Sequence, residues 1–233
     1  MSDILEHSGF YTGHTICPYT GLKIPKTVKE NLVWRRKLRL AANKDGGLRN
    51  SLRQACAQSP IFWLNAFGWT FLQKRVGTDG VERSVKGLDV HVPFITWKVQ
   101  DEAIETIRSC IDNGEDILID KSRDMGASWI GLSVFHWYWQ FVPGCTFLEM
   151  SRNEKYVDQR GNMDTLFEKH RYLHKMQPIW LQPEIEDNLL RLKNEQNGNM
   201  IIGESTNQHA GQGARKTAVL LDEFARVREA EEI

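Results

Sequence analysis

The sequence predicts an α/β fold with three layers, in which helices cover a mainly parallel sheet that follows an N-terminal helical region. Three observations predict it. Short apolar segments at 116–120, 145–151 and 218–225 have the length of buried strands. Segments with helical spacing separate them, and strands that alternate with helices are typical of a parallel sheet. A polar loop with one glycine also follows the first apolar segment directly and precedes a helical pattern.

The size and composition indicate an ordinary globular protein of one or two domains. The chain has 233 residues, 41% of them hydrophobic and 26% charged, and its net charge is zero. The charge is unevenly placed, because residues 1–60 hold ten Lys or Arg and four Asp or Glu. This basic region could meet a polyanion, or it could be the solvated face of a helix around residues 29–39.

The sequence argues against secretion and against a membrane location. It begins "MSDILEHSGFYTG", which has early acidic residues and no long apolar core, so it is not a signal peptide. The most aromatic stretch, "VFHWYWQFV", is too short and too polar to span a membrane. The four cysteines form no CxxC pair, so neither a zinc site nor a disulfide framework is predicted, and reduced thiols fit the cytosol.

The N-terminal region, 1–76, is expected to be mainly helical, and residues 26–75 have a helical pattern. Within it, Ser59 and Pro60 resemble the N-cap and first residue of a helix. The polar, glycine-rich segment 77–87 is expected to be a loop. It would separate this region from a second domain at 88–233.

The second domain is expected to alternate helices and strands. Residues 96–114 have helical spacing, 116–120 form a short strand, and the pattern from 128 to 141 predicts a buried helix. A second strand at 145–151 precedes a mostly helical region, 153–177. The segment 188–205 predicts a hairpin with Asn197 and Gly198 at its turn, as an insertion or an edge feature of the sheet.

The polar loop at 121–128 has part of the pattern of a phosphate-binding loop. That pattern is G-x-x-x-x-G-K-[ST], and this loop reads K-S-R-D-M-G-A-S. Gly126 and Ser128 match it, whereas Lys121 replaces the first glycine and Ala127 replaces the lysine. Taken alone, this match is weak, and an ordinary strand-to-helix turn in which Gly126 supplies a positive φ explains the segment better.

Two further features favour a nucleotide site. The apolar strand at 218–225 carries Asp222 and Glu223, and P-loop nucleotidases hold Mg²⁺ with a carboxylate at such a strand end. An adjacent glutamate can polarise the water that attacks the γ-phosphate. Upstream, Gln100 could read the edge of adenine through its amide, and Trp97 could stack on the ring, although core packing also explains an aromatic side chain there.

In combination these segments resemble the large subunit of tailed-phage terminases, the P-loop ATPase of the DNA-packaging motor. The resemblance covers residues 60–228, and its matching segments stand in the same order as in that family. They are "FWLNAFGWTF", "FITWKVQ", "KSRDMGASW", "LEMSRNEKYVDQRGNMDTLFEK" and "GESTNQHAGQGARKTAVLLDEFAR".

The resemblance implies a role for each matching residue. Lys121 or Arg123, early in the loop, would supply the phosphate-binding cation that Ala127 cannot, and the sequence does not rank the two. Ser128 and Asp222 would coordinate Mg²⁺. The remaining roles are Glu223 as the catalytic carboxylate, Arg215 as an arginine finger for a neighbouring subunit or as a DNA contact, and Gly126, Trp97 and Gln100 in nucleotide binding.

The function that the resemblance implies is ATP hydrolysis coupled to translocation of double-stranded DNA into a procapsid. Its cofactors would be ATP and Mg²⁺. Its partners would be DNA, the portal protein, the small terminase subunit and further copies of the chain in a ring, in the cytoplasm of the infected host cell. The alternative is a non-catalytic module that binds DNA, the small subunit or the portal and has a degenerate nucleotide site. A cellular helicase-like ATPase would normally have the lysine that is absent at position 127.

The end of the sequence differs from that family, in which further strands and a nuclease domain follow. The sequence stops at Ile233, ten residues after Glu223. We therefore expect a sheet that is incomplete at its C-terminus and no nuclease activity from this chain. Reduced or absent ATPase activity is also compatible with the sequence.

Overall fold

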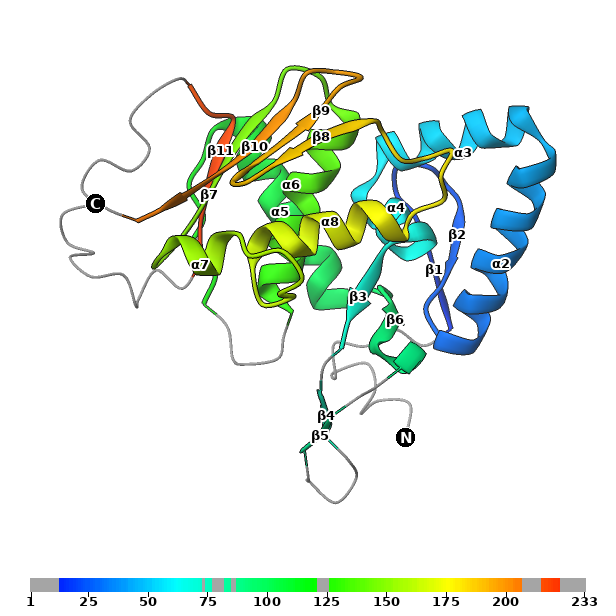
Figure 1. Cartoon of the computed structure of the whole chain (residues 1–233). Coiled ribbons are helices and arrows are strands. Elements are labelled where there is room, and N and C mark those ends of the chain that lie inside the picture. The colour runs from blue at the N-terminus through cyan, green and yellow to red at the C-terminus, as the bar shows by residue number, and fades with distance from the viewer. Residues whose placement is uncertain are drawn as a thin grey trace. The chain divides into compact units, whose positions relative to one another are not determined.

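The fold is α/β, as the computed structural model shows for residues 13–72, 74–76, 82–84, 87–120, 126–206 and 215–222 (Figure 1). The chain divides into two compact units. The first comprises Met1–Asp101 with Lys175–Trp180, and the second comprises Glu102–His174 with Leu181–Ile233. Residues 88–101, which were predicted to belong to the second domain, therefore belong to the first unit.

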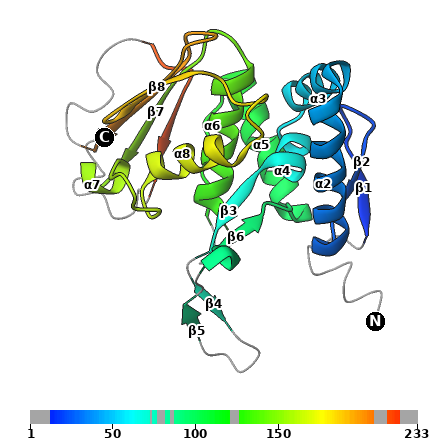
Figure 2. The same cartoon turned by 45° about the vertical axis from the view of Figure 1, so that its right-hand side comes forward.

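Within the described residues, the first unit combines helices α2, α3 and α4 with short antiparallel strand pairs. Helices α2, α3 and α4 lie beside the β1–β2 hairpin (Figure 2). Strand β3 pairs with β6, and β4 pairs with β5. The elements are β1 (His14–Ile16), β2 (Lys23–Pro25), α2 (Val28–Lys44), α3 (Gly46–Gln58), α4 (Pro60–Phe67), β3 (Trp69–Phe71), β4 (Lys74–Val76), β5 (Glu82–Ser84), the 3₁₀ helix η1 (Gly87–Val90) and β6 (His91–Pro93).

The helical prediction for 26–75 is confirmed for 28–67, apart from the caps between helices, and is wrong for 69–71 and 74–75, which lie in strands β3 and β4. Helix α4 ends at Gly68, where an added Cβ would lie 2.8 Å from the carbonyl oxygen of Leu64. The residues that follow, Trp69, Thr70 and Phe71, are aromatic or β-branched and favour a strand. Their antiparallel pairing with β6 decides the conformation, because it satisfies their backbone groups.

The predicted N-terminus of α4 is confirmed. The Ser59 side chain accepts a hydrogen bond from the backbone N–H of Phe62 at 3.1 Å, and Pro60 occupies the first turn. Such a cap stabilises a helix by about 1 kcal/mol. All eight residues of α4 are buried, so this helix is the core of the first unit.

Two buried cations hold the first unit together. The guanidinium of Arg35, on α2, donates to the carbonyl oxygens of Leu64 and Gly68, at the C-terminal end of α4, and of Phe94, which follows β6. The ammonium of Lys26 donates to the Asp101 carboxylate at 2.9 Å and to the Thr96 hydroxyl at 2.7 Å. Both cations therefore join segments that are far apart in the sequence.

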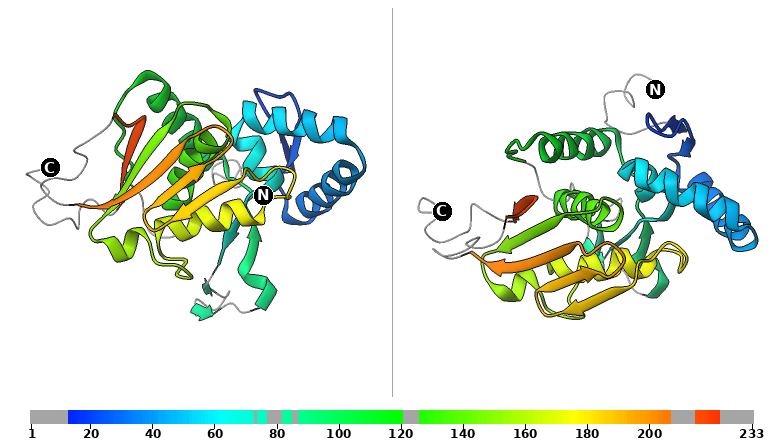
Figure 3. Two further views of the ribbon diagram at one scale, coloured as in Figure 1. Left: turned by 45° about the horizontal axis from the view of Figure 1, so that its top comes forward. Right: turned by 90° about the horizontal axis from the view of Figure 1, so that it is seen from above.

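The second unit is built on a five-stranded mixed sheet with the strand order β11-β7-β10-β9-β8 (Figure 3). Strands β10 and β11 both pair parallel to β7, whereas β8, β9 and β10 pair antiparallel. The prediction of a mainly parallel sheet is thus confirmed only in part. The elements from this part of the chain are α5 (Lys98–Asn113), α6 (Ala127–Phe141), β7 (Thr146–Ser151), α7 (Glu154–Val157), α8 (Leu166–Met176), β8 (Ile185–Asn188), β9 (Arg191–Asn194), β10 (Met200–Ser205) and β11 (Ala218–Leu221).

The strand predicted at 116–120 is wrong. Residues 115–120 have no regular secondary structure, and the side chain of Leu118 is 90% exposed. A short apolar run becomes a strand only where a neighbouring strand accepts its hydrogen bonds. Among the described residues, β11 pairs only with β7, and no strand pairs with 116–120.

Helices α6 and α8 cover the same face of the sheet. Phe135 of α6 stacks on Phe147 of β7 at a ring distance of 4.5 Å, and His170 of α8 contacts Glu149 two residues along the same strand. Side chains two apart on a strand point to the same face. The contacts therefore establish one helical layer on the sheet, and the three-layer arrangement stays a prediction.

The predicted hairpin is confirmed and has a second role at the C-terminus of α6. Strands β9 and β10 form the hairpin, and Gly198 has φ +77° in its turn. Asn199 follows this turn and is almost fully buried. Its amide donates to the carbonyl oxygens of Trp139 and Val142 at 3.0 and 2.6 Å, so the hairpin caps the end of α6.

None of the helices in the described ranges combines the length and the apolar character that a membrane crossing needs.

Candidate nucleotide and metal site

The candidate site begins at the N-terminus of α6. Gly126 is the N-cap residue and has φ +75° and ψ +17°, a left-handed conformation that glycine adopts without strain. From Ile130 to Gln140 every residue of α6 is buried, as the apolar pattern predicted. The buried body of the helix fixes the position of its first turn, where Ser128 lies and the backbone N–H groups give a partial positive charge.

Ser128 lies beside Asp222, as the sequence predicted for two ligands of one metal ion. The Ser128 hydroxyl donates to Oδ1 of Asp222 at 3.1 Å, across 94 residues of sequence. Asp222 directly follows β11, and its backbone N–H donates to the carbonyl oxygen of Met150 at 2.9 Å. Both side chains are half-buried. The start of α6 and the carboxyl end of β11 therefore meet at one point.

The Ser128–Asp222 pair has the chemistry of a magnesium site that a substrate completes. Mg²⁺ prefers oxygen ligands and is commonly held by one or two protein groups together with substrate phosphates and water. A hydroxyl and a carboxylate in hydrogen-bond contact fit this pattern. The described residues contain no cluster of three or more His, Cys, Asp or Glu that could hold a metal ion by itself.

A buried lysine, Lys169 on α8, belongs to the surroundings of this pair, and the sequence reasoning missed it. Its ammonium donates to the carbonyl oxygen of Asp164 at 3.1 Å. Burial lowers the pKa of Lys169, while attraction to Asp222, Asp164 and Glu149 opposes that shift. One signal was present in the sequence, since Lys169 stands three residues after the apolar Leu166 and shares its side of the helix.

Behind the pair, a chain of polar groups crosses the interior between α6, α8 and β7. Nδ1 of His136 lies 3.1 Å from Nδ1 of His170, and Nε2 of His170 lies 2.6 Å from Oε1 of Glu149. The side chains of His170 and Glu149 are completely buried, and His136 is buried too. Burial, followed by the proximity of His170 and His174, lowers the pKa of His136 well below its usual value, so this ring is neutral at pH 7.

Gln100 and Trp97 lie at the start of α5, in the part of the chain assigned to the first unit. Oε1 of Gln100 accepts a hydrogen bond from the backbone N–H of Trp97 at 3.1 Å. This is the reach-back contact of a capping box, in which the third helical residue bonds the N-cap. Gln100 is buried and Trp97 half-buried. The structure thus gives Gln100 a structural role, and its predicted contact with adenine stays a prediction.

Arg215 is exposed and lies at the other end of β11 from Asp222. Thr217, just before β11, pairs with Thr146, where β7 begins, through hydrogen bonds of 2.6 and 3.0 Å. The 4 residues of β11 separate Thr217 from Asp222 and span about 13 Å in extended conformation, so Arg215 is not brought to the Ser128–Asp222 pair of its own chain. This placement leaves a role toward another molecule, either a neighbouring subunit or DNA, as a prediction.

Three predicted site residues, Lys121, Arg123 and Glu223, lie outside the described residues. Their roles in phosphate binding and catalysis therefore stay predictions.

Comparison with models of known protein families gave no match, and comparison with curated proteins gave none either.

Proposed function

We propose that this chain is the ATPase part of the large subunit of a viral DNA-packaging motor. The observation that carries the proposal is the contact between Ser128 and Asp222. It joins the start of a buried helix to the end of a parallel strand, and P-loop nucleotidases hold Mg²⁺ with a hydroxyl and a carboxylate in such positions. The order of the sequence segments, which resembles that of terminases, supplies the particular class.

In the proposed site, Ser128 and Asp222 would hold the Mg²⁺ that accompanies ATP. The metal ion would neutralise charge that develops on the phosphates during hydrolysis. Ser128 also directs its hydroxyl toward Asp222, which keeps both oxygen ligands on one side of the first turn of α6. Lys121 or Arg123 would supply the phosphate-binding cation, and Glu223 would orient the attacking water.

Nucleotide binding and hydrolysis test separate parts of this proposal. Calorimetric titration with a slowly hydrolysed ATP analogue should give Mg²⁺-dependent binding in the wild-type chain. Asp222→Asn should lose the dependence on Mg²⁺, whereas Glu223→Gln should bind normally and lose hydrolysis. Glu184→Gln is a matched control, because it removes an exposed carboxylate elsewhere on the second unit. Absence of nucleotide binding in the folded wild-type chain would reject the proposal, and turnover by Glu223→Gln would reject that residue's role.

A second candidate is a non-catalytic module that binds DNA, the small terminase subunit or the portal. Two observations favour it, namely Ala127 in place of the phosphate-binding lysine and the lack of strand pairing at 116–120. It predicts no heat with nucleotide and Mg²⁺, together with DNA binding that weakens steeply with salt. The same calorimetric series therefore separates the two candidates.

A further inference from the structure

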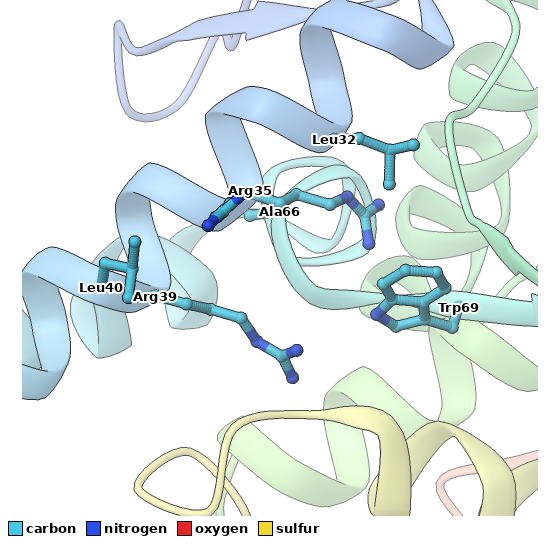
Figure 4. A pocket seen from close by; sticks show the side chains of 7 residues that line it. Leu32, Arg35, Arg39, Leu40, Ala66 and Trp69 are labelled. Carbon is cyan, nitrogen blue, oxygen red and sulfur yellow. The ribbon is translucent and has the colours of Figure 1, made fainter.

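The first unit contains a pocket of about 370 Å³ between α2 and the corner where α4 passes into β3 (Figure 4). Its charged lining residues are all arginines, Arg35, Arg36 and Arg39, and no acidic side chain lines it. The other lining residues are Leu32, Leu40, Ala66 and Trp69. A concave site with charge of a single sign focuses its electric field and attracts the opposite charge.

The three arginines differ in what they contact. Arg35 is 3% exposed and donates its guanidinium hydrogens to backbone carbonyls, so it forms part of the pocket wall. Its guanidinium carbon also lies 5.4 Å from the centroid of the Trp69 ring. Arg39 is half-buried and donates one hydrogen bond to the carbonyl oxygen of Met176 at 2.9 Å. Arg36 is exposed at the rim. Guanidinium groups have five N–H donors, so Arg36 and Arg39 retain donors for a ligand.

The electrostatics of this pocket favour an anion. Burial, and then the proximity of Arg39, lowers the pKa of Arg35 to about 9, and no carboxylate among the lining residues offsets the two like charges. Burial also lowers the pKa of Arg39. A bound anion would relieve this repulsion, and paired guanidinium groups match the oxygens of a phosphate. The indole of Trp69 adds a flat apolar surface at the same opening (Figure 4).

We propose that Arg36, Arg39 and Trp69 form a binding site for a phosphate ester, in which the arginines bind the phosphate oxygens and the indole contacts the adjoining sugar or base. Two sources present this chemistry, a free nucleotide and the backbone of a nucleic acid. The site lies in the first unit and uses none of the residues assigned to ATP hydrolysis, so it stands or falls independently of the proposed ATPase function.

The test uses the full chain and two probes, adenosine monophosphate and a 20-base-pair DNA duplex, each titrated by calorimetry at low salt. Arg36→Gln should weaken binding of the preferred probe about tenfold, as expected for loss of a charge-assisted hydrogen bond. Arg39→Gln should weaken it at least as much. Lys37→Gln is the matched control, because it removes the same charge from an exposed position on α2 that does not line the pocket.

The outcomes separate cleanly. Preferential binding of the monophosphate, sensitive to Arg36 and Arg39 but not to Lys37, supports the site with a free nucleotide as its ligand, and the same pattern with the duplex supports a nucleic-acid contact. Equal losses in Arg36→Gln and Lys37→Gln would show general charge attraction and overturn the proposal. Binding of neither probe, or binding that both arginine variants retain, would overturn it too. Circular dichroism shows whether each variant is folded. Because Arg36 is exposed, Arg36→Gln should fold and still tests the site if Arg39→Gln does not fold.

Discussion

Replacing Asn199 with alanine should destabilise the second unit by removing the cap of α6. The Asn199 amide donates to the carbonyl oxygens of Tyr138, Trp139 and Val142 at 3.3, 3.0 and 2.6 Å. Its side-chain oxygen accepts from the backbone N–H of Cys145 at 2.8 Å. Alanine removes all four contacts, and the protein groups left behind are buried or part-buried.

The magnitude follows from counting the groups that lose a partner. The amide has two hydrogens for three carbonyl oxygens, so the side chain supplies two donor bonds and one acceptor bond. At about 1 kcal/mol net for each, the loss is about 3 kcal/mol. For a chain of this size, that change lowers the midpoint of thermal unfolding by about 6–12 °C.

The assay is urea unfolding followed by far-ultraviolet circular dichroism, with the free energy of unfolding extrapolated to water. Asn188→Ala is the matched control, because Asn188 is an exposed residue of β8 and its amide donates to the Glu186 carboxylate at 2.7 Å on the surface. The control should change stability by less than about 0.5 kcal/mol. If Asn199→Ala unfolds at the wild-type urea midpoint with an unchanged slope, the capping argument is wrong.

Three further predictions concern buried charges. Arg171→Met should lower the free energy of unfolding, measured in urea, by about 3–5 kcal/mol. The reason is that the fully buried Asp158 carboxylate loses the guanidinium that binds both of its oxygens at 2.7 and 2.9 Å. A loss under about 1 kcal/mol would contradict this. Lys26→Met should lower the free energy of unfolding by a similar amount, because it leaves the Asp101 carboxylate without its ion-pair partner. Lys26→Arg should restore little of this loss, since the compact ammonium of lysine also binds Thr96. An unchanged urea midpoint in Lys26→Met would show that the ion pair is dispensable. His136 is neutral in the folded chain, so below its unfolded pKa of about 6.5 only the unfolded chain takes up this proton. The free energy of unfolding should therefore decrease as the pH is lowered, by up to about 1.4 kcal/mol per pH unit. His136→Gln should reduce that slope between pH 6.5 and 5, and an identical slope would assign the effect to other groups.

The elements that could be predicted from the sequence are those with a strong local signal. The buried helix α6 has a mostly apolar sequence, and Ser59 with Pro60 marks the start of α4 by capping chemistry that acts within four residues. The hairpin had its Asn197-Gly198 turn. In each case the deciding interactions lie close together in the sequence, so the pattern of residues carries the information.

The features that could not be predicted depend on distant partners. The apolar run at 116–120 has strand-like composition, yet a strand also needs a neighbour, and composition does not say whether one is present. Gln100 has the residue type for reading adenine, but its side chain bonds the N-terminus of its own helix. Lys169 was overlooked because a lysine is expected at the surface, and only the fold shows that it is buried near Asp222.

In the candidate site, the pairing of Ser128 with Asp222 was predictable because both positions belong to a pattern with fixed places in the fold. The strand order could not be read from the sequence in the same way. Arg215 stands only seven positions before Asp222, which suggests proximity. The strand between them instead carries the two residues to opposite ends.

The contacts at the two ends of α6 have a consequence for how the chain is made. Asn199 binds the last turn of the helix and Asp222 binds the first, across 57 to 94 residues of sequence. A ribosome has therefore completed this apolar helix long before either partner emerges. During that interval α6 can pack on β7, but both of its ends lack these partners and its remaining apolar surface attracts other chains or a chaperone. Production of the protein should accordingly respond to chaperone supply and to translation speed across residues 142–222 more than the modest size of the chain suggests.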